Sequence, residues 1–187
     1  MRTQANKRKQ NRPLPPALRH TLPSATQDLI KRIREKPARV LTGKHCVQGS
    51  YPSKKMGCTI GFESHRVEYP TILKLEYDPT VLEYYCQPFP IKLAYEDKNG
   101  ANRAVLHTPD YFVVTATDAG YWETKCEKDI RALAEQMPNR YVRQPDGSWR
   151  CPPGERAAAA QGLTYRVFVT DCVSPEYTRN IIYIDDY

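Results

Sequence analysis

The sequence Arg103-Ala-Val-Leu-His-Thr-Pro-Asp-Tyr-Phe-Val-Val-Thr115, followed by Tyr121-Trp-Glu-Thr-Lys-Cys126, sets the architecture of this chain. Both runs are rich in β-branched and aromatic residues, which favour strands, and residues 117–120 between them are typical of a turn. In the second run Glu123 and Lys125 are two positions apart, so they share one face of the strand. If the loop of this hairpin has an even length, Asp110 falls on the same face near Lys125.

Two acids and a lysine at one place suit a divalent metal ion beside a phosphate. A phosphodiester is protected by its own charge, and hydrolysis adds charge on the attacking and leaving oxygens. Mg²⁺ is held by one or two carboxylates, keeps water or phosphate oxygens as its other ligands, and lowers the pKa of bound water. A lysine can orient that water or offset the developing charge. The pattern therefore indicates phosphodiester hydrolysis.

A third acid is expected upstream, on a helix predicted over residues 61–79 from its apolar stripe. Pro70 is awkward inside a helix. Either the helix begins near His65 and holds Pro70 in its first turn, or it kinks there. Glu63 and Glu68 are both candidates to face the hairpin. Glu68 is preferred because Glu63 belongs to the lead-in of the helix.

These residues carry a resemblance to a known family. Glu68, Pro109-Asp110 and Glu123-x-Lys125 resemble the PD-(D/E)xK nuclease pattern of restriction endonucleases and related DNA-cutting enzymes. Over roughly residues 50 to 172, the chain is similar to the N-terminal endonuclease domain of TnsA, a subunit of Tn7-like heteromeric transposases. The similarity is carried by Tyr51-Pro-Ser-Lys-Lys-Met56, Phe62-Glu-Ser-His-Arg-Val-Glu68, Leu75-Glu-Tyr-Asp-Pro79 and Tyr84-Tyr-Cys-Gln-Pro-Phe89, ahead of the Thr-Pro-Asp of the hairpin.

The resemblance implies that Glu68, Asp110 and Glu123 surround Mg²⁺ or Mn²⁺, and that Lys125 is the catalytic lysine. Some family members carry glutamine at the position of Glu123. The resemblance also implies a restriction-endonuclease-like α/β sandwich with a mixed central sheet flanked by helices, in the core order αβββαβ.

The remaining segments agree with that order. A strand interrupted by prolines is expected over 81–95, and an uninterrupted strand over 164–170. Helices are expected over 127–137 and 155–162, with a turn at 145–148 inside an insertion between them. His107 precedes Pro109-Asp110, where a hydrogen-bonded structural histidine is the favoured interpretation. The cysteines form no CxxC pair, so neither zinc nor a disulfide framework is indicated.

The charge divides the chain into two parts. The net charge is +7, yet residues 1–55 alone carry +12 and residues 56–187 carry −5. The chain is therefore predicted to have a basic, partly flexible N-terminal arm over 1–50 and a nuclease domain over 51–187. A short amphipathic helix at 24–36 either lies on DNA or a partner, or packs on the core. The expected DNA-binding residues are Lys7, Arg8, Lys9, Arg12, Lys54, Lys55 and Lys128.

The resemblance implies a role in which the chain nicks the 5′, non-transferred strand at transposon ends. The implied partners are DNA, a TnsB-like transposase and a TnsC-like AAA+ regulator. A stand-alone restriction or repair nuclease and a catalytically inert DNA-binding assembly module are the alternatives. The family's C-terminal helical domain does not follow the last strand, so the expectation is that the sequence is a fragment, or that this domain is missing or supplied by another chain. A bacterial cytoplasmic location is expected. No apolar run approaches 18 residues, so the chain is not expected to span a membrane.

Overall fold

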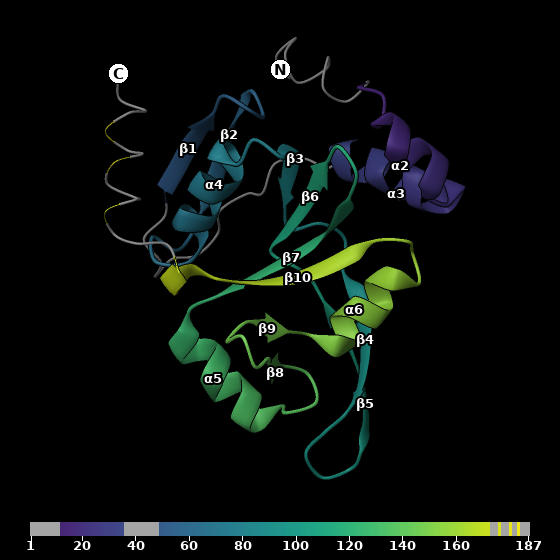
Figure 1. The fold of residues 1–187 in the computed structure, drawn as a ribbon, viewed down its shortest axis with the longest axis vertical. Helices are drawn as coiled ribbons and strands as arrows, with labels where there is room; N and C mark the ends of the chain where they lie inside the picture. The colour runs from purple at the N-terminus through teal and green to yellow at the C-terminus, as the bar shows by residue number, and fades with distance from the viewer. Residues whose placement is uncertain (1–11, 36–48, 173–175, 177–179, 181–182, 184–187) are drawn as a thin grey trace.

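The central element of the fold is a mixed four-stranded sheet. The computed structural model describes residues 12–35 and 49–172, with Glu176, Asn180 and Tyr183 as single further positions (Figure 1). The strand order is β10–β7–β6–β3, in which β10 runs parallel to β7 and the other neighbours are antiparallel. This confirms the predicted mixed sheet. The strands are β3 (Val81–Cys86), β6 (Tyr111–Thr115), β7 (Ala119–Lys125) and β10 (Thr164–Val169).

Both faces of this sheet are covered, because successive side chains of β6 alternate between two cores. Phe112 and Val114 belong to one core cluster, whereas Tyr111 and Val113 belong to the other. The first cluster includes residues of the helices α2 (Pro16–Thr21), α3 (Ser24–Glu35), α5 (Glu127–Gln136) and α6 (Pro152–Ala159). The second includes residues of α4 (Glu68–Tyr77) and of the hairpin formed by β1 (Gly49–Ser53) and β2 (Cys58–Phe62). The predicted α/β sandwich and its core order, α4-β3-β6-β7-α5-β10, are confirmed.

Two of the expected strands are divided. The continuous strand predicted over 103–115 is wrong, because residues 102–107 form β5 (Asn102–His107), which pairs with β4 (Ile91–Glu96) in a separate two-stranded sheet. Pro109 lies in the break and has no N–H for a ladder. The run over 81–95 divides in the same way into β3 and β4, at Gln87, whose φ is 44°, and at the two prolines that follow it.

The helix predicted over 61–79 is shorter than expected, since α4 begins at Glu68 and Gly61 and Phe62 belong to β2. Pro70 lies in its first turn, where a missing N–H breaks no helical hydrogen bond. Of the two alternatives for Pro70, the structure therefore has the first-turn placement.

A buried carboxylate fixes α4 against its neighbours. One oxygen of Glu76 accepts hydrogen bonds from Ser53 Oγ (2.5 Å) and Tyr84 OH (2.8 Å), and the other accepts one from the Lys55 backbone N–H (2.7 Å). Because a buried carboxylate is stable only when its oxygens are satisfied, these bonds lock α4 to β1 and β3. The position of Glu68 at the start of α4 follows from that packing.

The C-terminal half follows the predicted order. The helix at 127–137 and the strand at 164–170 are confirmed to within a residue, whereas α6 begins at Pro152 instead of at residue 155. Residues 145–148 form the predicted turn, between β8 (Val142–Arg143) and β9 (Trp149–Arg150).

The amphipathic helix α3 packs on the core. Ile30 and Ile33 are fully buried in the first cluster, and Thr26 Oγ1 donates to the Gln161 carbonyl at 2.6 Å. Of the two alternatives for this helix, the structure therefore has core packing. The expected boundary near residue 50 does not separate α3 from the nuclease core. Lys7, Arg8 and Lys9 lie outside the described residues.

Candidate active site

The β6–β7 hairpin brings three of the four predicted catalytic residues, Asp110, Glu123 and Lys125, onto one face. Val114 pairs with Ala119, so an even number of residues, 115–118, lies between the last paired positions of the hairpin. The turn predicted over 117–120 extends too far along the chain, because Ala119 and Gly120 already belong to β7. Tyr111 pairs with Trp122, and the same register continued by one step sets Asp110 opposite Glu123.

Lys125 lies between two carboxylates. Its Nζ is 2.5 Å from Glu123 Oε1 and 3.7 Å from Asp110 Oδ2. The Asp110 carboxylate is oriented by the backbone N–H of Thr124, which donates to Oδ2 at 2.7 Å. The backbone carbonyl of Asp110 accepts from the Gln87 N–H at 2.7 Å. Asp110 is therefore held by β7 on one side and by the residue that follows β3 on the other, although it precedes β6.

The second oxygen of Glu123 is bound by His107. The side chain of Glu123 is 2% exposed, and its Oε2 lies 2.8 Å from His107 Nε2. On the other side of the ring, Nη2 of Arg140 lies 3.1 Å from His107 Nδ1. Because a guanidinium can only donate, Nδ1 accepts and the ring proton lies on Nε2, which donates to Glu123. The Tyr165 hydroxyl lies 3.0 Å from the same His107 nitrogen.

Sequence reasoning identified His107 as a hydrogen-bonded histidine but missed Arg140 and Tyr165. These two residues are separated from His107 by 33 and 58 positions. No motif spacing links positions so far apart, so only the tertiary fold reveals this polar network.

The charges of the site shift its pKa values in opposite directions. Burial and the negative charge of Glu123 raise the pKa of Asp110 to about 6, against the attraction of Lys125. Burial alone would raise the pKa of Glu123, but the His107 hydrogen bond and the Lys125 charge outweigh it and hold that pKa below its usual value. Burial would lower the pKa of Lys125, and the two carboxylates more than offset this and raise it. At neutral pH, Glu123 and Lys125 are therefore ionised.

Glu68 begins α4 beside this site. Its Oε2 accepts from the backbone N–H of Glu63 at 2.7 Å, and its carbonyl accepts from the Tyr111 hydroxyl at 3.3 Å. Its charge adds to those that raise the pKa of Asp110, after burial and Glu123. Within 12–35 and 49–172, no three Asp, Glu, His or Cys side chains are grouped closely enough to hold a metal ion together.

The donor set of Asp110 and Glu123 fits a hard divalent cation. Mg²⁺ takes one or two carboxylates and keeps water for its other positions. Two carboxylates share a single lysine here, and their repulsion is visible in the raised pKa of Asp110. A cation at this place would relieve that repulsion.

The predicted DNA-binding residues have different surroundings. Arg12, Lys54 and Lys128 are exposed. The ammonium of Lys55 instead donates to the carbonyls of Leu75 and Asp78, both at 2.7 Å, at the end of α4. Lys55 therefore has a structural contact that the sequence pattern did not predict.

Comparison with known protein families gives a match over the central part of the chain. Residues 78–170 match the sequence model of a family described as TnsA-like endonuclease N terminal. This segment contains Asp110, Glu123 and Lys125, whereas Glu68 precedes it. No curated protein matches the chain. Among the described helices, none has the length and apolar character needed to cross a membrane.

Proposed function

Because residues 78–170 belong to the TnsA-like endonuclease N-terminal family, we propose that this chain is the metal-dependent DNA endonuclease subunit of a Tn7-like heteromeric transposase. It hydrolyses a phosphodiester of the 5′, non-transferred strand at transposon ends. The observation that carries the proposal is the ammonium of Lys125, which lies between the carboxylates of Glu123 and Asp110.

The carboxylates define where a cofactor would bind. Asp110 and Glu123 would hold Mg²⁺ or Mn²⁺. Glu68 is proposed as the third ligand on the family resemblance, although in this structure its carboxylate is not grouped with theirs and accepts from the Glu63 N–H. When bound, the cation supplies a polarised phosphoryl group and a water of lowered pKa.

The chain's own residues prepare the site for that chemistry. Lys125 stays protonated between its two carboxylates, so it can donate to the attacking water or to a phosphate oxygen. His107 donates to Glu123 and so fixes the orientation of that carboxylate. Asp110, with its pKa near 6, is ionised above that pH.

Placement on DNA is proposed to come from the partners. A TnsB-like transposase brings the transposon ends to the site, and a TnsC-like AAA+ regulator commits the complex to a target. The family match supports a transposase setting, while the exposed basic residues Arg12, Lys54 and Lys128 support direct DNA contact.

The test is strand-specific cleavage of labelled transposon-end DNA with Mg²⁺ or Mn²⁺, with and without the cognate transposase. Metal-dependent nicking of the 5′ strand that requires the transposase, and that Asp110→Ala and Lys125→Ala both abolish while the variants stay folded, is the expected result. Cleavage of any DNA by the chain alone would instead indicate a stand-alone nuclease. DNA binding without cleavage under all these conditions would indicate an inert assembly module.

A further inference from the structure

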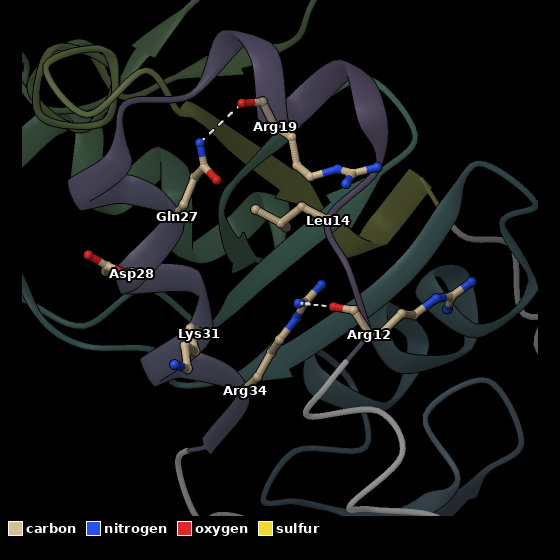
Figure 2. A pocket seen from close by; sticks show the side chains of 7 residues that line it. All are labelled: Arg12, Leu14, Arg19, Gln27, Asp28, Lys31 and Arg34. Atoms are coloured by element: carbon tan, nitrogen blue, oxygen red, sulfur yellow. Dashed lines mark hydrogen bonds between the residues drawn. The ribbon is translucent and has the colours of Figure 1, made fainter.

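A basic hollow lies between α3 on one side and α2 with the segment that leads into it on the other. Neither Asp110 nor Glu123 lines it. Its volume is about 340 Å³. The α3 residues that line it recur at helical spacing and therefore form one stripe of the helix. The lining residues are Arg12, Leu14 and Arg19 on one side and Gln27, Asp28, Lys31 and Arg34 on the other (Figure 2).

Hydrogen bonds to buried and backbone groups build the walls of this hollow. The side chain of Arg34 is only 6% exposed and donates to both oxygens of Glu83, each at 3.0 Å. Its Nη1 donates to the Arg12 carbonyl at 2.6 Å. Across the hollow, Gln27 Nε2 donates to the Arg19 carbonyl at 3.1 Å. The leading segment is therefore fixed against α3, and the hollow is a built feature of the fold.

The charges around the hollow are not balanced. Arg12, Arg19 and Lys31 are exposed, and within the described part of the chain no carboxylate lies at ion-pair distance from them. Asp28 is the one acid in the lining, while the charge of Arg34 is matched by Glu83. Cations of like sign around a concave surface raise the local concentration of anions.

The hollow lies on the same side of the sheet as Asp110 and Glu123. Glu83, which holds Arg34, pairs with Val114 of β6, and directly opposed residues share a face. Asp110 lies four positions before Val114, so it shares that face as well. The hollow is therefore connected through Arg34 and Glu83 to the sheet face that carries Asp110.

We propose that this hollow binds a backbone phosphate of the DNA, at a position separate from the phosphate that is hydrolysed. Arg19 and Lys31 are its principal ligands, because a guanidinium offers a planar fork to phosphate oxygens and an ammonium offers a point charge. The contact sets how the duplex lies along the sheet and carries no base specificity. The inference rests on the proposed function for the identity of the polyanion.

The test uses the full chain carrying Asp110→Ala, so that the DNA stays intact during the measurement. Binding of a short fluorescein-labelled duplex is followed by anisotropy over a series of salt concentrations. The Arg19→Gln/Lys31→Gln pair is compared with a matched pair, Lys92→Gln/Lys98→Gln, which removes the same charge from exposed positions of the β4–β5 hairpin. Arg34 is left unchanged because it holds Glu83.

The expected result is that the hollow variant binds more weakly and that its slope of log affinity against log salt is smaller by about 1 to 2. The matched variant keeps the parent slope, and both keep the parent melting temperature. Equal slopes for the two variants would overturn the proposal. So would unchanged DNA binding with lost association to the transposase, which would identify an acidic protein as the occupant.

Failure of the proposed function would give a different combination of results. In that case the chain with Asp110 intact cleaves no DNA with its transposase, whereas the hollow variant, unlike the matched variant, loses salt-dependent DNA binding. The endonuclease role then fails and the phosphate site stands.

Discussion

Asp110 is the residue whose charge the surrounding fold opposes most clearly. Its pKa in the folded chain is about 6, above the ordinary value of 3.8, because burial and Glu123 disfavour the ionised form. The folded state is therefore destabilised above pH 6, and this penalty fades as the pH falls toward 4. Removing the charge relieves the penalty.

We therefore expect Asp110→Asn to raise the free energy of unfolding at pH 8 by up to about 3 kcal/mol, while it abolishes cleavage. Asparagine keeps an acceptor for the Thr124 N–H. Melting curves without metal, taken from pH 8 down to pH 4.5, check this, and the gain over the parent should shrink along the series. A variant that melts below the parent at pH 8 would contradict the assigned pKa shift.

His107 is expected to act through Glu123. His107→Leu removes the shorter of two hydrogen bonds to Glu123 Oε2 and the acceptor that faces Arg140, which should lower stability by about 1–3 kcal/mol and strongly reduce cleavage. His107→Gln retains a donor and should restore part of the rate. Cleavage rates over a series of Mg²⁺ concentrations check this, with the exposed His20→Leu as control. Equal rates for His107→Leu and His107→Gln would exclude a positioning role.

At this scale the sequence predicts the residues whose relation is local. Glu123 and Lys125 share a strand face by the two-residue period, and the even loop then brings Asp110 to them. The contact of Arg140 with His107 depends on how the segment after α5 returns to β5. The spacing of residues within one helix or strand does not predict that path. The orientation of the Glu68 side chain is equally beyond a spacing argument, since it follows from the backbone N–H of Glu63.

At the level of elements, α3 is expected to be part of the folding unit. Ile30→Ala removes a fully buried side chain from the first core cluster, so the free energy of unfolding should fall by about 2–5 kcal/mol. Chemical denaturation of the full chain checks this. The matched control is Leu106→Ala, because Leu106 is 78% exposed and its loss should change stability by no more than about 0.5 kcal/mol. Similar values for the two variants would mean that α3 does not belong to the core.

Element types were easier to predict than element boundaries. The apolar runs over 81–95 and 103–115 both indicate strands, and both contain strands, yet each run serves two different sheets. The chain passes from one sheet to the other at Pro109, which interrupts the ladder, and at Gln87, which has a positive φ. A single sequence shows that such places break a strand, but not that the two pieces join separate sheets.

For the molecule as a whole, metal binding should be coupled to folding. A cation that binds only the folded state adds about 2.7 kcal/mol of stability when present at ~100 times its Kd. We expect Mg²⁺ to raise the melting temperature of the parent and chelation to reverse the rise, while Asp110→Asn shows little change. Thermal denaturation with added MgCl₂ or EDTA checks this. An equal rise in both proteins would place the cation elsewhere.

The parallel pairing of β10 with β7 has a consequence for the order in which the chain folds. β3, β6 and β7 can assemble from antiparallel neighbours close in sequence, whereas β10 must return past α5 and α6 to reach β7. Contacts of high sequence separation require a larger loss of chain entropy before they form. β10 is thus expected to dock late, and it delivers Tyr165 to the hydroxyl contact beside His107 and Glu123. A nascent chain would carry its acids and lysine on an open sheet edge, and Tyr165 would reach them only after β10 has been synthesised.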